Sequence, residues 1–496
     1  MAKKTINKEL TGAQDLYNFL FEACNIIRGP VSQDNFKDYI TPLLYYKRIS
    51  DVYDEETEEA LISSGGDKEY ASLPEQHRFV IPDGCHWQEV RERTENLGAA
   101  IVGAMRQIEI ANPDTLYGVL SMFSSQKWTN KAILNDSKIR DLIEHLSKRK
   151  LGNKDYPADL MGDAYEILLK KFADDSKAQA GEFYTPRSVV RLLVHILDPQ
   201  PGETVYDPAC GSGGMLIEAI RYMHDDSLCC GSIFGQEKNV VNAAIAKMNL
   251  FLHGASDFNV MQGDTLRDPK ILQGGNIAKF DCVIANPPFS LENWGATEWS
   301  SDKYKRNIYG TPSDSCGDYA WIQHMICSMS SGKGRMAVVM PQGILFRNQE
   351  TEIRKQLVES DLIEAVVTLG DKLFYGTGLS PCFLIIRRMK PAHHSGRILM
   401  IDGSKILTQK RAQNILEEND IDRLYSLYQN YSDEEDYSRI VTLQEIRDKE
   451  YNLSPNRYVV YHKEEIRPYA EVLAEFKHAY EEVKRLEEEF SLLINA

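Results

Sequence analysis

Short apolar runs alternate with segments of helical periodicity through the middle of the chain. The run at 203–206 leads through a glycine-rich turn into a helical segment at 215–220, and residues 240–252 are a second helical segment. Strands that alternate with helices in this way are typical of a parallel sheet in an α/β fold. The runs that we interpret as successive strands are residues 203–206, 232–235, 259–261 and 280–285.

Three later apolar runs extend the predicted sheet. Residues 335–341, 362–367 and 381–386 are short and rich in Val, Ile, Leu and Phe, as buried strands are. With the first four runs they complete a mixed sheet of about seven strands. We therefore expect an α/β fold with a Rossmann-like sheet, in a domain at residues 166–410.

The N-terminal flank, residues 1–165, is predicted to be a helical domain. Residues 14–27 and 36–53 carry apolar side chains at helical spacing, and a polar loop from about 55 to 82 interrupts them. A helix beginning at Asp159 leads from this flank into the sheet.

The C-terminal region, residues 411–496, turns polar and helical again. Its final segment places apolar side chains at three- and four-residue spacing among many Glu and Lys residues. Such a stripe suits docking on a partner helix or a coiled coil, and it suits packing on its own domain equally well. The residues of the stripe are Leu473, Phe476, Tyr480, Val483, Phe490 and Leu493.

Acids and an amide follow the first four predicted strands in turn. These residues are Asp207, Glu237, Asp264 and Asn286. Because open α/β sheets bind ligands at the carboxyl ends of their strands, we expect the four side chains to be neighbours. An acid after the second strand is placed to accept both hydroxyls of a ribose, and one after the third can accept an adenine amino group. A helix cap or a solvated turn is the alternative for each residue alone.

The first strand continues into a glycine-rich turn at 207–214, with the letters D-P-A-C-G-S-G-G. Its small residues let the backbone approach a ligand closely, and the following helix start favours an anionic or polar group. Leu216 stands where the dinucleotide fingerprint needs its third glycine, so that fingerprint is absent. Cys210 invites a covalent interpretation, but we expect a small buried thiol that packs beneath the turn.

Asn286-Pro287-Pro288-Phe289 leaves the fourth strand. The two prolines hold the segment extended, so that the amide oxygen and nearby carbonyls converge. Two such acceptors can bind an exocyclic amino group, and Phe289 can stack on the ring that carries it, as in enzymes that act on an extruded base. For this motif in isolation, the alternative is a strand-to-loop turn that the prolines make rigid and that has no catalytic role.

These motifs resemble those of S-adenosylmethionine-dependent amino-methyltransferases of DNA. The glycine turn is similar to their cofactor motif, and N-P-P-F is similar to the motif of those that methylate adenine N6. Residues 181–187, G-E-F-Y-T-P-R, resemble the additional cofactor motif that contacts the methionine end. The combination, strongest over about residues 160 to 390, is similar to the modification (methyltransferase) subunit of type I restriction-modification systems.

The resemblance implies S-adenosylmethionine as cofactor, no metal, and a methyltransferase catalytic domain at 166–410. Asn286 Oδ1 and the Pro287 carbonyl would accept the N6 hydrogens of a flipped-out adenine and localise its lone pair for attack on the methyl group. The implied catalytic residues are Asn286, Pro287, Pro288 and Phe289. The implied cofactor-binding residues are Glu182, Phe183, Tyr184, Thr185, Pro186, Arg187, Asp207, Gly211, Ser212, Gly213, Glu237 and Asp264.

Composition bears on the partners. The chain has 496 residues, of which 73 are acidic and 57 basic, for a formal net charge of −16. DNA affinity comes largely from Lys and Arg on phosphates, so this balance indicates that a partner holds most of the DNA. A local exception is the basic run 303–306, which could reach phosphates, although such a short run is more often a solvated face. Since nothing in the last third resembles a long target-recognition domain, we expect a separate specificity subunit to choose the target.

The resemblance further implies two copies of this chain per specificity subunit, and it leaves open whether a restriction (nuclease and translocase) subunit joins them. The nine cysteines lack paired-zinc spacing, and neither a signal peptide nor a long apolar span is evident. We therefore expect a cytoplasmic protein without membrane contact.

Two other functions remain open. Protein glutamine methyltransferases use a related N-P-P turn, although tyrosine usually follows the prolines and the large helical flanks here would be unexpected. An inactive scaffold that binds cofactor or DNA is the second alternative.

Overall fold

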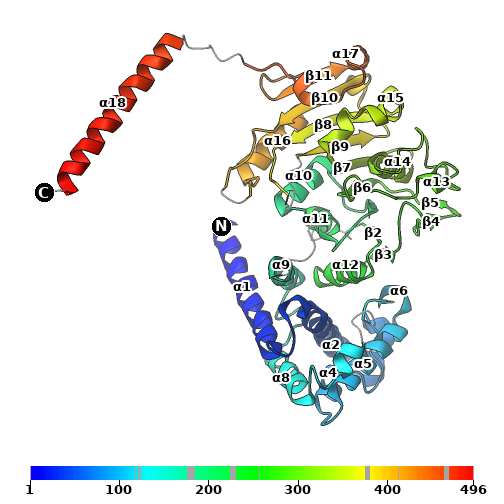
Figure 1. The fold of residues 1–496 in the computed structure, drawn as a ribbon. Coiled ribbons are helices and arrows are strands. Elements are labelled where there is room, and N and C mark those ends of the chain that lie inside the picture. The colour runs from blue at the N-terminus through cyan, green and yellow to red at the C-terminus, as the bar shows by residue number, and fades with distance from the viewer. Residues whose placement is uncertain are drawn as a thin grey trace.

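The computed structural model describes residues 2–116, 118–120, 125–175, 185–223, 231–255, 257–374, 380–410, 413–462 and 469–494. Helices α1 to α8 form the N-terminal part, a mixed sheet covered by helices forms the middle, and α18 stands apart at the C-terminal end (Figure 1). Among the described residues, no helix combines the length and the apolar character that crossing a membrane requires.

The N-terminal helices share one apolar core, which includes Leu20, Leu44, Tyr45, Ile101 and Trp128. Both helices predicted there are confirmed, but α2 continues to Ser63, so the loop predicted from about residue 55 begins later. The helices are α1 (Ala2–Ile27), α2 (Lys37–Ser63), α3 (Lys68–Ala71), α4 (Trp87–Arg91), α5 (Leu97–Ala111), α6 (Pro113–Leu116), α7 (Ser125–Thr129), α8 (Asp136–Leu146) and α9 (Ala158–Asp175).

The described residues form a nine-stranded sheet in the order β11-β10-β8-β9-β7-β6-β1-β2-β3, which confirms the mixed α/β fold and adds two strands to the predicted seven. Neighbouring strands are parallel, except that β9 is antiparallel to β7 and β8, and β11 is antiparallel to β10. The strands are β1 (Val205–Asp207), β2 (Ile233–Glu237), β3 (Phe258–Gln262), β6 (Cys282–Ala285), β7 (Arg335–Pro341), β8 (Ile363–Leu369), β9 (Pro381–Arg387), β10 (Arg397–Gly403) and β11 (Ser438–Thr442); β4 (Leu272–Gln273) and β5 (Asn276–Ile277) pair separately.

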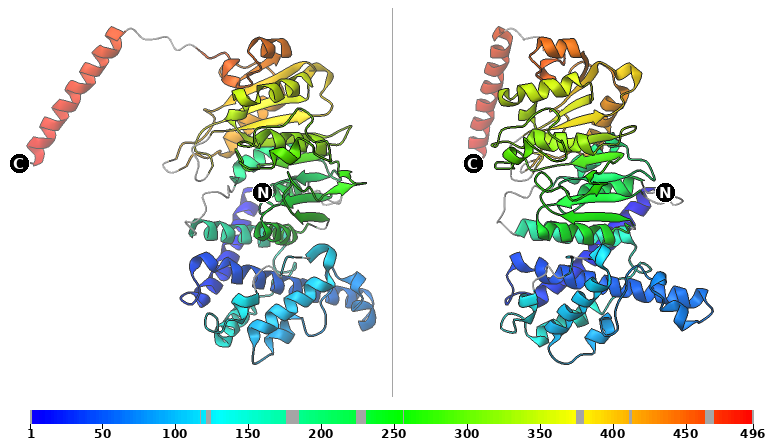
Figure 2. Two further views of the ribbon diagram at one scale, coloured as in Figure 1. Left: turned by 45° about the vertical axis from the view of Figure 1, so that its right-hand side comes forward. Right: turned by 90° about the vertical axis from the view of Figure 1, so that its right-hand side faces the viewer.

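Helices cover both faces of the sheet, as Figure 2 shows. Successive residues of β6 alternate between two apolar cores: Cys282 and Ile284 belong to one, and Val283 and Ala285 to the other. Because both faces are buried, the strand reads as a continuous apolar run. One face is covered by α10 (Arg187–Leu197), α11 (Gly214–Met223) and α16 (Glu418–Asn430), and the other by α14 (Asp318–Ser328), α15 (Thr351–Glu359) and α17 (Leu443–Asp448).

Helix α12 (Val240–Leu252) joins the N-terminal helices to the sheet, and lies between them in Figure 1. Its Phe251 and Met248 belong to the N-terminal core, whereas Ala246 and Leu250 belong to a core of the sheet. The short α13 (Ala296–Trp299) lies in the loop after β6. Since α9 packs on both α1 and α12, the N-terminal helices are fixed beside the end of the sheet that carries β2 and β3.

Helix α18 (Tyr469–Ile494) carries the predicted C-terminal stripe. Large apolar side chains along it are exposed, and the helix lies away from the rest of the described chain (Figures 1 and 2). The Leu493 side chain lies outside the described residues. The exposed side chains are Val472, Phe476, Tyr480, Val483, Leu486 and Phe490.

Candidate active site

A pocket opens at the carboxyl end of β1, between the glycine turn and the start of α10. Strands β6, β1 and β2 are adjacent and parallel, so Asn286, Asp207 and Glu237 lie at strand ends on the same edge. The residues that line the pocket are Thr185, Arg187, Val190, Asp207, Ala209, Cys210, Gly211, Ser212, Gly214, Met215, Glu218 and Asn286.

The structure brings six of the predicted site residues into the pocket wall: Thr185, Arg187, Asp207, Gly211, Ser212 and Asn286. Pro186 and Gly213 lie beside this wall in the chain, Glu237 ends β2, and Asp264 follows β3. The predicted Glu182, Phe183 and Tyr184 lie outside the described residues.

The glycine turn has a backbone that requires glycine at two positions. Gly211 and Gly213 have φ values of 53° and 85°, in the left-handed region that side-chain-bearing residues rarely adopt. A Cβ at Gly213 would come within 3.5 Å of the Ala246 backbone, so the turn lies close against α12. The turn therefore presents bare backbone to the pocket.

Cys210 packs under this turn. A Cβ on Gly235 of β2 would lie 3.0 Å from its sulfur, and burial raises the pKa of the Cys210 thiol. A buried neutral thiol is a poor nucleophile. The geometry thus supports the packing interpretation over the covalent one.

Asp207 is buried at the mouth of the sheet. Its Oδ1 accepts a hydrogen bond from the Ala209 N–H at 2.9 Å. Burial raises the pKa of this carboxyl from 3.8 to about 8, the Ala209 N–H opposes the rise, and the charge of Glu237 adds to it. A cationic ligand in the pocket would favour the ionised form.

Asp207 should make the ligand-free protein less stable as the pH rises. Between about pH 4 and pH 8 the folded protein keeps a proton on Asp207 that the unfolded chain has lost, so this contribution to stability falls with rising pH. We expect Asp207→Asn to have a higher Tm than the wild-type protein at pH 8, with a smaller difference at pH 5. Thermal scans at the two pH values measure this, and a difference that does not change with pH would contradict it.

Glu237 ties the glycine turn to the next helix. Its Oε2 accepts the Gly211 N–H at 2.9 Å, and its Oε1 accepts the Asn239 N–H at 2.7 Å. Asp264, beyond β3, accepts the Arg267 N–H at 3.3 Å and forms an ion pair with Lys238 at 2.9 Å. Glu237 is the last residue of β2, and Asp264 lies in the loop that follows β3.

Among the described residues, Asn286 has a hydrogen-bond acceptor without a partner. Its Nδ2 donates to Thr185 Oγ1 at 2.7 Å, which fixes the orientation of the amide across 101 positions of sequence. Its Oδ1 is buried and has no hydrogen-bond partner among the described residues. An unsatisfied buried acceptor costs about 1–3 kcal/mol, so such an atom is poised to accept a donor. The contact also joins the predicted cofactor motif to the predicted base-binding motif.

Phe289 is half-buried, and its ring lies 6.3 Å from that of Phe374 at an angle of 57°. The next residue, Ser290, has a φ of 50°, and its N–H donates to Asp318 Oδ1 at 2.7 Å. The direction of the chain after the two prolines is therefore set partly by a residue of α14.

Glu218 lines the pocket and was not singled out by the sequence. It lies on α11, four residues beyond Gly214, and its carboxylate is 3.8–3.9 Å from the guanidinium groups of Arg187, Arg191 and Arg221. An acid one turn into the helix after such a glycine turn lies on the side of the helix near the turn. The spacing between Gly214 and Glu218 could therefore have predicted Glu218 as a pocket residue.

The prediction that the basic run 303–306 reaches phosphates is wrong for Arg306. This side chain is 1% exposed, pairs with Asp302, and donates to the carbonyls of Thr265 and Leu266 at 2.9 and 2.7 Å. It holds the loop after β6 to the loop after β3. Lys303 and Lys305 remain exposed.

Comparisons with known proteins agree with this geometry. The family model described as N-6 DNA Methylase matches residues 156–466, and that described as HsdM N-terminal domain matches residues 16–146. The type I restriction enzyme MjaVII methylase subunit of Methanocaldococcus jannaschii is 35% identical over 90% of this chain and 78% of its own length. The HindI methylase subunit of Haemophilus influenzae is 31% identical over 70% of this chain and 76% of its own length.

A solved structure agrees as well. The type I restriction-modification system methyltransferase subunit from Streptococcus thermophilus superposes with a TM-score of 0.77 at 26% identity, covering 91% of this chain and all of that one. The chain therefore belongs to the N-6 DNA methylase family. Within it, the chain belongs to the methylase subunits of type I restriction enzymes. This confirms the family and the class of enzyme predicted from the motifs.

Proposed function

We propose that this chain transfers a methyl group from S-adenosylmethionine to N6 of an adenine flipped out of DNA, as the modification subunit of a type I restriction-modification complex. The observation that carries the proposal is the buried Oδ1 of Asn286, which has no hydrogen-bond partner among the described residues and lies just after β6, directly before Pro287. Together with family membership, this acceptor favours an amino group as the target.

The residues present fit S-adenosylmethionine, which carries a positive charge on sulfur. The pocket wall holds the carboxyls of Asp207 and Glu218, and its glycine turn admits close approach. When bound, the cofactor supplies a methyl group activated by the sulfonium. We assign Thr185, Pro186 and the glycine turn to its methionine end, where Arg187 and Glu218 offer opposite charges to the carboxylate and the amino group. Glu182, Phe183 and Tyr184 complete this motif by resemblance.

Glu237 and Asp264 are assigned to the nucleoside part of the cofactor. Glu237 ends β2 and accepts the ribose hydroxyls, and Asp264 follows β3 and accepts the adenine amino group. Both assignments rest on the order of strand ends along the sheet edge.

On the target side, Asn286 Oδ1 and the Pro287 carbonyl accept the two N6 hydrogens of the adenine. These bonds draw the hydrogens out of the ring plane and localise the nitrogen lone pair toward the methyl group. Pro288 keeps the segment extended, and Phe289 stacks on the base. Attack of a neutral nitrogen on a sulfonium methyl needs positioning more than proton transfer, so Asn286 acts by orienting the amine.

Glu237→Gln should weaken cofactor binding. The substitution keeps the shape of the side chain but removes its charge, and its amide would face a backbone N–H of Gly211 or Asn239. We expect S-adenosylmethionine to bind more weakly, by roughly 1.5 to 3 kcal/mol, as measured by calorimetry.

Glu445→Gln is the matched control, because Glu445 also accepts a backbone N–H, that of Thr442 at 3.0 Å. Glu445 lies on α17, directly after β11, at the opposite edge of the sheet from β2 and β3. The cofactor affinity of this variant should equal that of the wild-type protein. Unchanged affinity in Glu237→Gln would move the ribose site elsewhere.

We further propose that a separate specificity subunit chooses the DNA target and binds two copies of this chain, and that α18 is the docking surface. The exposed apolar stripe of α18 and the acidic net charge of −16 support this division of labour. The test is transfer of labelled methyl groups to adenine in DNA, with and without candidate partner subunits. Transfer to glutamine of a protein substrate instead of adenine would favour the alternative methyltransferase.

A further inference from the structure

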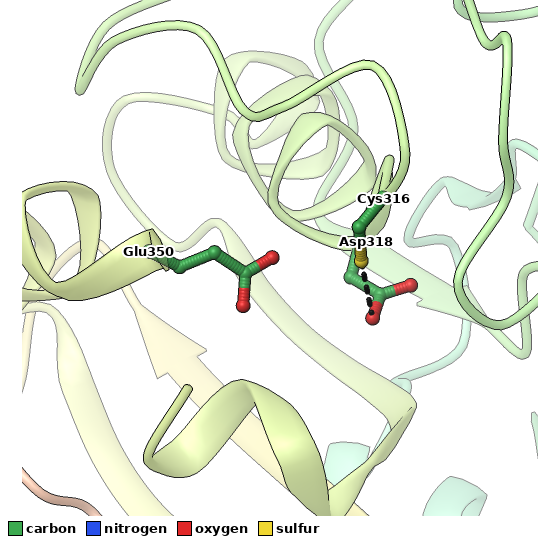
Figure 3. Close-up of side chains that lie close together, drawn as sticks. All are labelled: Cys316, Asp318 and Glu350. Carbon is green, nitrogen blue, oxygen red and sulfur yellow. Dashed lines mark hydrogen bonds between the residues drawn. The ribbon is translucent and has the colours of Figure 1, made fainter. Parts of the chain in front are cut away.

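A buried cluster of charges lies behind the turn that follows Phe289. Figure 3 shows that Cys316 and Asp318, at the start of α14, and Glu350, from the segment before α15, point toward a common space. Asp318 is 0% and Glu350 2% exposed. The three side chains could hold a metal ion by their spacing alone.

The guanidinium of Arg347 already contacts all three groups. Its Nη1 lies 2.7 Å from Cys316 Sγ, its Nη2 pairs with Asp318 Oδ2, and its Nε lies 3.4 Å from Glu350 Oε2. A second cation beside a guanidinium would be repelled. The cluster is therefore an arginine-centred ion network and not a metal site.

The two buried carboxylates repel each other, and the guanidinium groups of Arg347 and Arg354 both offset this repulsion at Glu350. Burial raises the pKa of Glu350 to about 6; Arg347 opposes this rise and the charge of Asp318 adds to it. Asp318, by contrast, accepts from three donors: the Arg347 guanidinium and the Cys316 thiol at Oδ2, and the Ser290 N–H at Oδ1. The network thus fixes Asp318 as an acceptor for these groups.

The backbone conformation of Ser290 has to be stabilised by a contact of this kind. Ser290 is the residue after Phe289, and its φ of 50° is one that a residue with a Cβ adopts only when the surroundings enforce it. The next residue is also tied to α14, because Leu291 O accepts the Gly317 N–H at 3.0 Å. Gly317 and Asp318, at the start of α14, therefore hold the chain just after the Phe289 ring.

We propose that Asp318 is a positioning residue for the target base, an inference that rests on the proposed function. Asp318 holds Ser290 in the left-handed conformation and so sets the direction of Phe289 and of the two prolines. Arg347 and Glu350 keep Asp318 in place. The cofactor half of the pocket does not touch this network: none of Asp318, Arg347 and Glu350 lines it.

Asp318→Asn tests this role with the least change in shape. The amide has one acceptor oxygen where Arg347 and Ser290 both require one, so an NH2 group must face one of the two donors. In the assembled complex we expect kcat to fall by about tenfold to a hundredfold, as misplaced reacting groups do. The KM for S-adenosylmethionine and its affinity by calorimetry should not change.

Two readouts separate positioning from a merely structural role. A duplex with 2-aminopurine at the mapped target adenine should lose its fluorescence gain on binding the variant. Ser290→Gly added to Asp318→Asn should restore part of kcat, because glycine adopts a positive φ without a tether. If Asp318 had only a structural role, Asp318→Asn would lower the Tm but keep the wild-type fluorescence gain. Its kcat would also stay at the wild-type level, so Ser290→Gly would have nothing to restore.

Glu364→Gln is the matched control: Glu364 is also buried and pairs with Arg387, but on β8 and β9. It should lower the Tm and leave kcat unchanged. If Asp318→Asn does not fold, Arg347→Lys keeps the charge but not the three-way contact, and should lower kcat in the same direction. Wild-type kcat in a folded Asp318→Asn complex, or loss of cofactor affinity with it, overturns the positioning role. Absence of adenine methylation by the wild-type complex overturns the proposed function instead.

Discussion

Asn286→Ala should abolish methylation while cofactor binding survives. The substitution removes Oδ1, the acceptor proposed for the adenine amino group, and loss of one preorganised polar contact of this kind costs on the order of a hundredfold or more in rate. The substitution removes an unsatisfied oxygen, which stabilises, and the Nδ2 hydrogen bond to Thr185 Oγ1, which destabilises, so the Tm should change little. Single-turnover transfer of labelled methyl groups in the assembled complex measures the rate, and calorimetry measures the affinity.

Asn112→Ala is the matched control for this variant. Asn112 is a buried amide of the N-terminal helical part, and its Nδ2 donates to Val80 O and Ile108 O at 2.8 and 2.7 Å. Its loss should lower the Tm and leave the methylation rate unchanged. A rate for Asn286→Ala within a few-fold of wild type would remove Asn286 from the mechanism.

Loss of the α18 stripe should weaken assembly with the specificity subunit. Phe476 and Tyr480 are exposed and stack on each other with ring centroids 6.4 Å apart, so replacing both by Ala removes docking area without disturbing a core. We expect this pair of substitutions, like deletion of residues from about 464 onward, to weaken the complex by at least about tenfold in Kd. Light scattering after size-exclusion chromatography reports its stoichiometry.

The control for the stripe is on the same helix. Lys477→Ala with Glu481→Ala alters two neighbouring exposed polar positions at the same spacing, and it should leave assembly intact. Both double variants should bind S-adenosylmethionine as the wild-type chain does. Normal assembly of the truncated chain would refute the docking role of α18, and methylation of one defined sequence by the chain alone would refute the need for a specificity subunit.

Several features of the site could be predicted from local pattern. Each of the first four predicted strands is an apolar run followed closely by an acid or an amide, and parallel pairing brings those strand ends to one edge. Asp207 and Asn286 therefore fell into one pocket wall as expected. The expected strand count was too low by two: β10 and β11 follow the last predicted strand, and β11 is a partly exposed strand at the edge of the sheet, antiparallel to β10.

The sequence by itself determined the α/β class, the order of the strand ends, the glycine turn and the prolines after Asn286, because each depends on neighbouring residues alone. Tertiary structure decided which polar groups meet. The orientation of the Asn286 amide depends on Thr185, and the conformation of Ser290 depends on Asp318 and Arg347. Burial of Arg306 likewise depends on carbonyls about 40 residues away, at Thr265 and Leu266. Such partners are distant in sequence and are selected by packing, so no local spacing reveals them.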